Sequence, residues 1–364
     1  MSNKPIHLSG LNGLRALAAL AVVWGHTLQG VTGDWGIPAF RLPIFSGGVT
    51  LFFVLSGFLI TYLLLQEKRI SDTVRIKAFY MRRILRIWPI YYAYIAICAV
   101  VFMVAGISDS IYNDKLWYYL LFFANIPFIS ATFIPIIGHF WSIGVEEQFY
   151  LFWPWLVKYT RKYLLSTIII VGGFWFGLKL LAWLYLGNNS WLYEFFNVTR
   201  FHCMMLGAIG AVLYERKIKW FMQGLTHWST QTLIWGLFIF AGWWPYLLPA
   251  VIREESIAVM SLVMIVGQVH GKFIVNLETR VFDFIGKISY GIYVIHPLLI
   301  YLLSILYRQL HVDLPLTLQY ILIYANVTFL TILIAWLSYT YFEKPFLKLK
   351  DRFAVVKSRN TFRI

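Results

Sequence analysis

Long runs of apolar residues alternate with short polar segments along nearly the whole chain, and this pattern predicts membrane-spanning helices. A helix needs about 20 apolar residues to cross the hydrocarbon of a bilayer. The predicted spans cover residues 13–30, 48–66, 87–106, 140–158, 163–186, 199–215, 231–248, 256–270, 284–306 and 317–342. The pattern is helical throughout, so the expected fold class is an all-α, polytopic integral membrane protein with about ten transmembrane helices.

An eleventh apolar piece, residues 116–136, is interrupted by Pro127 and Pro135. Positive residues in short loops mark the cytoplasmic side of a membrane. If this piece does not span, 25 of the 31 Lys and Arg residues fall on one side and four on the other. We therefore expect both termini in the cytoplasm and a re-entrant or interfacial segment at 116–136. Such a segment is tolerated only where protein buries it or where it lines a cavity.

The composition supports a membrane protein and excludes several other classes. The chain has 364 residues, of which 60% are hydrophobic and 13% charged, with a mean hydropathy of +0.70, whereas soluble proteins carry about 25% charged residues. The net charge of +15 comes from loops that flank apolar helices, so we expect no nucleic-acid partner. Cys98 and Cys203 lie inside predicted helices, which gives neither a disulfide framework nor metal-ligand spacing. Arg15 interrupts the first apolar stretch, which indicates a retained helix and not a signal peptide.

Ionisable residues inside the predicted helices are the candidates for function, since each costs a few kcal/mol in hydrocarbon. Arg15 and His26 share the first helix, and His26 lies about 16 Å further along its axis. On the expected topology His26 and Glu146 share a depth in the outer half of the bundle. A carboxylate near an imidazole fixes its tautomer and stabilises the imidazolium, as a general base requires. The alternative for His26 is a structural hydrogen bond between helices.

The helix at 140–158 places Ser142, Glu146 and Tyr150 on one face, because they are spaced by four residues, and directs Glu147 elsewhere. This face is expected to position an acceptor or the Glu146 carboxylate.

Arg83 and Arg86 share a face at the cytoplasmic entry of the third span. Their planar guanidinium groups suit the phosphates of a cytoplasmic donor, and contact with anionic lipid is the alternative. Arg200 begins a helix at its outer end, where a cation is not expected, and either faces a hydroxyl-rich or anionic acceptor or snorkels. For His296, a packing role is at least as favoured as catalysis.

The motifs together resemble the acyltransferase 3 family of membrane acyltransferases. The matching pieces, from residue 13 to 346, are GLRALAALAVVWGH, GGVTLFFVLSGFLIT, FYMRRILRIWPIYY, FWSIGVEEQFYLFWP, FIGKISYGIYVIHP and YFEKPF. Residues 1–350 are therefore expected to form the acyltransferase 3 transmembrane domain, and residues 351–364 a basic cytoplasmic tail. Many family members carry a further extracytoplasmic domain after the tenth helix, which we expect to be unnecessary here or supplied by another protein.

The family's charged motifs fall on Arg15 and His26, on Arg83 and Arg86, and on Ser142 and Glu146. The sequence departs from the family pattern at Thr50, where many relatives carry Asp. That difference affects the second helix and leaves the catalytic assignments unchanged.

The resemblance implies transfer of an acetyl group from cytoplasmic acetyl-CoA to a hydroxyl of a cell-surface or lipid-linked glycan, such as O-antigen or exopolysaccharide. It implies catalytic roles for His26 and Glu146, with His26 as general base or acyl carrier. Arg15, Arg83 and Arg86 would bind the donor, and Ser142, Tyr150 and Arg200 would bind the acceptor or support the site. Acetyl-CoA is then a substrate, with no permanently bound cofactor. The expected location is the bacterial inner membrane.

Two other functions explain the same residues. A transporter or flippase would use His26 and Glu146 as a proton relay, although the sequence lacks the paired halves common in transporters. An acyltransferase would also fit with a different acyl group or with a non-glycan acceptor.

Overall fold

The computed structural model describes residues 7–33, 47–106, 110–244, 248–272, 274–310 and 314–356. Every regular element in this part of the chain is a helix, as the sequence predicts. In chain order the α-helices are α1 (Leu11–Gly33), α2 (Gly48–Ser71), α3 (Ile76–Val104), α4 (Ser110–Leu120), α5 (Asn125–Ile129), α6 (Trp141–Thr160), α7 (Leu164–Leu186), α8 (Trp191–Thr199), α9 (Phe201–Glu215), α10 (Lys219–Thr226), α11 (Trp228–Trp243), α12 (Ala250–His270), α13 (Arg280–Lys287), α14 (Ser289–Leu310), α15 (Leu316–Leu337) and α16 (Lys344–Asp351).

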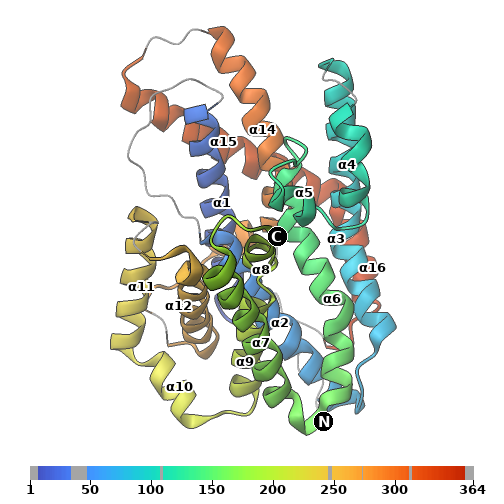
Figure 1. Ribbon diagram of the computed structural model, residues 1–364, viewed down its shortest axis with the longest axis vertical. Coiled ribbons are helices and arrows are strands. Elements are labelled where there is room, and N and C mark those ends of the chain that lie inside the picture. Colours follow the sequence, from blue (N-terminus) through green and yellow to red (C-terminus); the bar gives the residue numbers. More distant parts are fainter. Residues whose placement is uncertain are drawn as a thin grey trace.

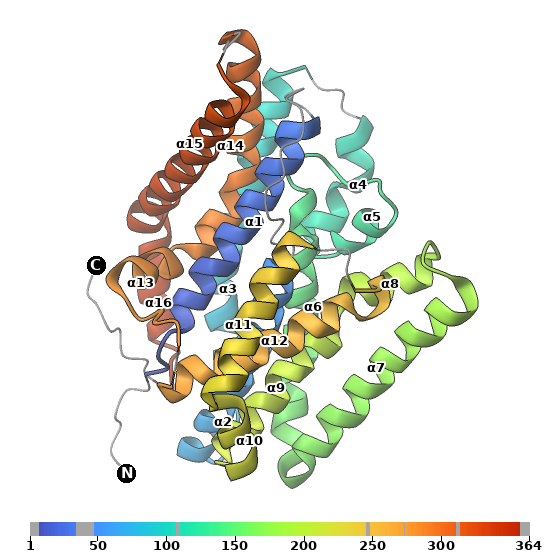
Figure 2. The ribbon, with the colours of Figure 1, turned by 90° about the vertical axis from the view of Figure 1, so that its left-hand side faces the viewer.

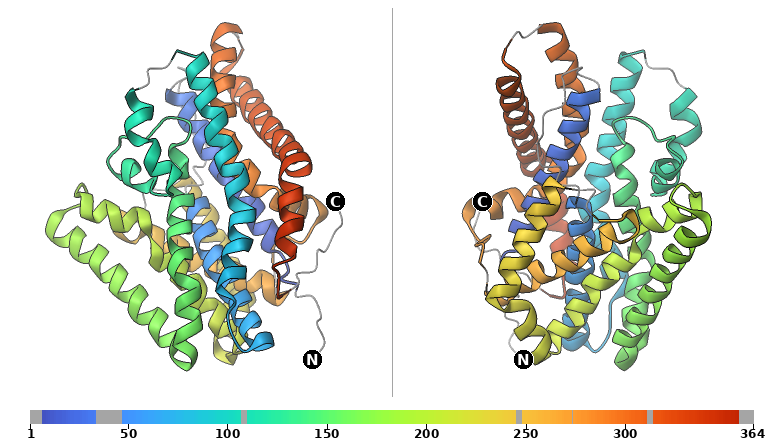
Figure 3. Two further views of the ribbon diagram at one scale, coloured as in Figure 1. Left: turned by 90° about the vertical axis from the view of Figure 1, so that its right-hand side faces the viewer. Right: turned by 60° about the vertical axis from the view of Figure 1, so that its left-hand side comes forward.

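The helices form two groups that meet along α1 and α2. Helices α1, α14 and α15 stand side by side, while α7, α8 and α9 pack together and α11 lies against α12 (Figures 1 and 2). Helix α2 joins the groups, because it contacts α1, α6, α9 and α12. On another side of the molecule α16 lies along α3 (Figure 3). This packing brings helices from both ends of the chain around α1, which carries Arg15 and His26.

Six helical stretches of the described chain are long and apolar enough to cross a membrane. They are Gly48–Ser71, Ile76–Val104, Leu164–Leu186, Trp191–Glu215, Ser289–Gln309 and Leu316–Asp351. Helices α1, α6, α11 and α12, which the sequence also predicts to span, are not among these six. The structure therefore supports a multi-pass membrane protein, and the number ten and the cytoplasmic termini stay predictions.

The Pro-interrupted piece at 116–136 contains no long helix. Helix α4 has 11 residues, about 16 Å at 1.5 Å per residue, and α5 has five. Positive φ angles at Phe122, Ala131 and Ile136 break the rest of the segment. Buried side chains such as Tyr119 and Ile134 fix it against the core. Residues 130–133 are exposed, so protein covers only part of this irregular backbone. Its re-entrant or interfacial position therefore stays a prediction.

Helices α2 and α9 approach so closely that glycine is required in both. A Cβ added to Gly57 would lie 1.9 Å from the carbonyl oxygen of Met204, and one added to Gly207 would lie 2.0 Å from that of Val54. Small residues permit this backbone contact in membrane helices, where van der Waals packing drives association. The pair forms the rigid frame on which α1 and α6 rest.

We expect Gly57→Ala to lower the thermal stability of the detergent-purified protein. The added methyl group cannot fit without separating α2 from α9, and such overpacking costs about 1–3 kcal/mol. Gly236→Ala in α11 is the matched control, because nothing lies within 4 Å of its added Cβ. Equal melting temperatures for Gly57→Ala and the wild-type protein would show that the contact is not tight.

A buried ion pair fastens the end of the described chain to the start of α3. The Glu67 carboxylate is 1% exposed and accepts hydrogen bonds from Arg82 Nη2 and the Arg75 backbone N–H, each at 2.8 Å. Arg82 Nη1 also donates to the carbonyl oxygen of Phe353 at 2.8 Å. Phe353 belongs to the predicted tail, residues 351–364, so the beginning of that tail is attached to α3. The remainder, from residue 357, lies outside the described residues.

Arg82→Ala is expected to destabilise the protein by about 3–5 kcal/mol, because it leaves the Glu67 carboxylate buried without its cation. Thermal unfolding in detergent measures this loss. Arg75→Ala is the control: it removes an exposed side chain and keeps the backbone N–H that binds Glu67. If Arg82→Ala and Arg75→Ala have the same melting temperature, the Glu67–Arg82 pair is not important for stability.

Candidate active site

His26 pairs with a second histidine, His296 of α14. Nδ1 of His26 is 2.7 Å from Nε2 of His296, and the ring planes are nearly parallel, 11° apart, with centroids 5.0 Å apart. Nδ1 of His296 lies 3.1 Å from the carbonyl oxygen of Ile292, one turn earlier in α14. His296 is fully buried and His26 is half-buried. A buried imidazole thus supports an accessible one.

These hydrogen bonds determine the tautomers of the neutral pair. A carbonyl oxygen only accepts, so Nδ1 of His296 carries its proton and Nε2 has the lone pair. Nε2 of His296 therefore accepts a hydrogen bond from Nδ1–H of His26. The other nitrogen of His26, Nε2, is then unprotonated. That is the state required of a general base or a nucleophile, with the tautomer set by the bond that the opposite nitrogen makes.

A third histidine, His139, lies next to this pair. Its ring meets that of His296 edge to face, with centroids 5.4 Å apart. Nε2 of His139 lies 3.2 Å from the Val294 carbonyl oxygen, and Nδ1 is buried without a hydrogen-bond partner. His296 lies in the motif FIGKISYGIYVIHP and His139 directly precedes the motif FWSIGVEEQFYLFWP. Only the packing of α14 against α1 and of residues 138–140 against α14 shows that both lie near His26.

Glu146 does not contact His26 through any hydrogen bond of the described residues. The Glu146 carboxylate accepts a hydrogen bond from Tyr150 Oη at 3.1 Å, and Tyr150 Oη lies 2.5 Å from Ser56 Oγ. The predicted orientation of His26 by Glu146 is thus replaced by His296. The helical spacing correctly placed Glu146 and Tyr150 on one face, but it did not show which helix that face meets.

Glu146 belongs to a second cluster, formed with the predicted donor-binding arginines. Its carboxylate interacts electrostatically with Arg83, Arg86 and Arg15, and Arg15 interacts with both of the other arginines. The structure therefore brings together residues of α1, α3 and α6 that the sequence assigned to donor binding and to catalysis. Like charges repel one another, and an anion lying among them offsets that repulsion.

The guanidinium groups of Arg83 and Arg86 are available to bind a ligand. Neither forms a hydrogen bond or ion pair within the described chain, and Arg83 Nε is buried without a partner. The Arg83 guanidinium instead lies over the rings of Phe79 and Tyr150, 5.8 Å from each centroid. Arg82, by contrast, is occupied by Glu67. The unused planar forks are suited to phosphate.

Glu343 is a member of this cluster that sequence reasoning did not identify. It closes the π-helix Ser338–Glu343, is buried, and accepts a hydrogen bond from Ser338 Oγ at 3.1 Å. Its carboxylate interacts electrostatically with Arg86. π-helical turns often occur at functional sites, and this one lies between α15 and α16.

Ser142 lies in a buried network between α6 and α14. Ser142 Oγ is 2.5 Å from Tyr293 Oη, and Tyr293 donates to the His139 carbonyl oxygen at 2.8 Å. These bonds hold the segment that carries His139 against α14. Glu147 points elsewhere, as predicted, and accepts a hydrogen bond from Trp88 Nε1 at 3.1 Å.

Arg200 is held by protein groups at the junction of α8 and α9, where its φ of 27° marks a sharp bend. Its Nη1 donates to Glu254 at 2.6 Å and to Thr50 Oγ1 at 2.8 Å, and Thr50 in turn donates to the Glu254 carboxylate. Thr50 and the Glu254 carboxylate of α12 thus bind the same nitrogen of Arg200. These contacts show Arg200 linking α2, α9 and α12, and direct contact with an acceptor stays a prediction.

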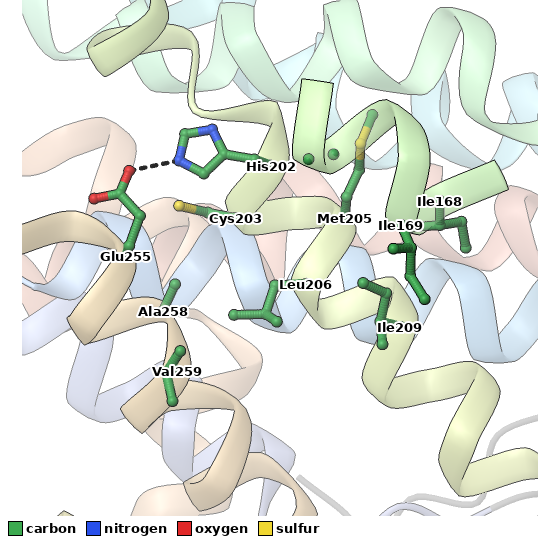
Figure 4. Close-up of a pocket in the computed structure, with 12 residues that line it drawn as sticks. Ile168, Ile169, His202, Cys203, Met205, Leu206, Ile209, Glu255, Ala258 and Val259 are labelled. Atoms are coloured by element: carbon green, nitrogen blue, oxygen red, sulfur yellow. Dashed lines mark hydrogen bonds and ion pairs between the residues drawn. The ribbon is translucent and has the colours of Figure 1, made fainter. Parts of the chain in front are cut away.

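A cavity of about 200 Å³ lies between α7, α9 and α12, and none of His26, His139 and His296 lines it (Figure 4). Its lining is mostly apolar, with His202 and Glu255 at one end (Figure 4). Glu255 Oε1 is 2.7 Å from His202 Nε2 and 2.7 Å from Lys179 Nζ. This ion-paired group joins the three helices.

The two clusters on α1 are separated by a fixed length. Arg15 and His26 belong to one continuous helix, so the arginine cluster and the histidine pair are about 16 Å apart along its axis. Within the described residues, no three His, Cys, Asp or Glu side chains are grouped as metal ligands.

Comparison with known proteins supports one family. The model of a family described as an acyltransferase domain matches residues 8–340. A Staphylococcus aureus (strain COL) protein designated an O-acetyltransferase is 28% identical over 385 residues, which cover 94% of this chain and 58% of the relative. The O-acetyltransferase OatA of S. aureus (strain NCTC 8325 / PS 47) is 25% identical over 368 residues with the same coverage. The chain thus spans less than two thirds of these relatives' length. No solved structure matches it.

Proposed function

The chain belongs to the acyltransferase 3 family, and from this premise we propose that it is a membrane O-acetyltransferase. Its donor would be cytoplasmic acetyl-CoA, and its acceptor a hydroxyl of a cell-surface or lipid-linked glycan, such as O-antigen or exopolysaccharide. The relatives named as O-acetyltransferases support the reaction type. We place the protein in the bacterial inner (cytoplasmic) membrane with both termini in the cytoplasm.

The observation that carries this proposal is the spacing of the unused arginines from the histidine pair. The pantetheine arm of acetyl-CoA has about the length of four extended residues, roughly 15 Å between diphosphate and sulfur. That length matches the separation of about 16 Å between Arg15 and His26 along α1. With its phosphates on Arg83 and Arg86, the donor would present its thioester near Nε2 of His26.

At this position His26 would act as the general base. Nε2 takes the proton of the acceptor hydroxyl as the hydroxyl oxygen attacks the thioester carbonyl carbon. The carbon–sulfur bond then breaks, and the proton on His26 passes to the CoA thiolate. In the carrier variant, Nε2 attacks the thioester carbonyl carbon and the carbon–sulfur bond breaks, so that CoA leaves as its thiolate. The acceptor hydroxyl then attacks the acetyl group on His26, the nitrogen–carbon bond breaks, and the hydroxyl proton passes to the thiolate. In both, the bond to His296 holds the imidazole in the reactive tautomer.

The remaining predicted residues would support these two centres. Glu146 and Tyr150 would hold the arginines in position, because Glu146 offers a carboxylate to them and Tyr150 lies beneath the Arg83 guanidinium. Ser142 would keep the segment of His139 in place through Tyr293. Arg200 would brace α9 at its bend.

Mass spectrometry of surface polysaccharides from cells with and without the gene tests the proposed acceptor. An acetyl-sized increment that depends on the gene is expected on one glycan. If every glycan is unchanged, a non-glycan acceptor is the next candidate. If purified protein also fails to consume acetyl-CoA with any hydroxyl acceptor, the proposal is wrong. A transporter that uses His26 and Glu146 as a proton relay then becomes the favoured function.

A further inference from the structure

A fourth cation, Lys350, joins the three arginines of the second cluster. Lys350 lies in α16 and interacts electrostatically with Arg86, Arg83 and Arg15. It arrives there because α16 packs along α3 and because Arg82, next to Arg83 in α3, binds the carbonyl oxygen of Phe353 just beyond α16. The start of the predicted tail thus forms one wall of the cluster.

The protein does not fully neutralise Lys350. Its ion pair with Asp351 spans 3.7 Å, and the Asp351 side chain is 72% exposed, so solvent screens that attraction. The Lys350 side chain itself is only 24% exposed. Lys348, on the same helix, is exposed to solvent. The contrast indicates that α16 directs one lysine to the arginines and another away from them.

The four cationic side chains of this cluster, which come from α1, α3 and α16, outnumber the glutamate carboxylates that interact with them. Glu146, Glu147 and Glu343 are the carboxylates that interact with Arg83 or Arg86, while Arg83 Nε is buried without a hydrogen-bond partner. Such a site is stabilised by a ligand that carries several negative charges. Acetyl-CoA has a diphosphate and a separate phosphate monoester on its ribose.

We propose that Lys350 binds the ribose 3′-phosphate of the acetyl donor, while Arg83 and Arg86 bind its diphosphate. This assignment rests on the proposed function. Planar guanidinium forks suit the diphosphate, and a mobile ammonium group is a point charge suited to a terminal monoester. Lys350 also lies in α16, beyond the last span predicted from the sequence at 317–342 and on the expected cytoplasmic side.

Binding of CoA and of dephospho-CoA, which lacks only the 3′-phosphate, tests this assignment. The affinities are measured by calorimetry with protein in zwitterionic detergent. Lys350→Gln is expected to weaken CoA binding about tenfold, the size of one charge-assisted hydrogen bond, and to leave dephospho-CoA binding unchanged. Unchanged dephospho-CoA binding also shows that the variant is folded. Lys348→Gln, the matched control, is expected to bind both ligands like the wild-type protein.

Other outcomes would overturn the assignment. If Lys350→Gln loses the same affinity for CoA and dephospho-CoA, or loses affinity for neither, Lys350 does not bind the 3′-phosphate. If Lys350→Gln leaves CoA binding unchanged but weakens adsorption to phosphatidylglycerol vesicles, the lysine serves a lipid headgroup. If the wild-type protein binds neither CoA nor dephospho-CoA, both the proposed function and this inference fail. If the wild-type protein binds both ligands and Lys350→Gln does not selectively weaken CoA binding, only this inference fails.

Discussion

Replacing His26 with alanine is expected to lower the rate of acetyl transfer about a thousandfold, within the usual range for loss of a general base or nucleophile. The variant should bind acetyl-CoA normally, because the arginine cluster is about 16 Å away along α1. The measurement is release of CoA from acetyl-CoA by purified protein with an acceptor glycan, together with a separate binding assay. A loss of rate without a loss of binding would place His26 at the chemical step.

His227→Ala is the matched control, since the His227 side chain is exposed and its Nδ1 lies 2.7 Å from Oγ of nearby Ser229. Its activity should equal that of the wild-type protein. His296→Ala should also lose activity, because His26 then lacks the acceptor that fixes its tautomer. Near-normal transfer by His26→Ala would eliminate both the base and the carrier role. Detection of acetylated His26 after acid quenching would show that His26 is the acyl carrier and not only a general base.

The second large effect is expected at Arg83. Arg83→Ala should weaken acetyl-CoA binding about ten- to hundredfold, since hydrogen bonds to charged groups contribute about 1.5–3 kcal/mol. Arg83→Lys should recover only part of the affinity, because an ammonium group cannot reproduce the planar fork. The rate at saturating acetyl-CoA should change much less than the affinity, as expected for a group that binds the donor without taking part in the bond changes.

Arg69→Ala is the control for this experiment, because Arg69 is 67% exposed and pairs with Glu215 at 3.7 Å. It removes one positive charge from the same side of the molecule without touching the cluster. Unchanged acetyl-CoA affinity in Arg83→Ala would contradict the donor site and leave anionic lipid as the partner of this arginine.

Hydropathy predicted the helical fold well and the helix ends less well. The third span was expected from residue 87, but α3 begins at Ile76, because a helix continues through the charged residues that a search for apolar stretches excludes. The last span was expected to end at residue 342, yet the helical chain continues through a π-helix into α16. That continuation carries Glu343 and Lys350 to the arginines.

The candidate site was predictable as a set of residues but not as a set of contacts. Spacing along one helix correctly separated Glu146 from Glu147, since each is bound by a different partner. It did not show that Glu146 would join the arginines or that His296 would bind His26. His26 and His296 are 270 positions apart in the chain, so their pairing depends on how α1 packs against α14, which periodicity within single helices does not specify.

We propose that the protein transfers an acetyl group covalently from a donor on one side of the membrane to an acceptor on the other. The most direct test uses sealed vesicles containing the purified protein, acetyl-labelled acetyl-CoA on the predicted cytoplasmic side and the acceptor glycan on the opposite side. We expect the label to appear on the glycan, and to be absent from it with His26→Ala. Glycan that crosses the membrane while all label stays on CoA would contradict the claim and identify a transporter.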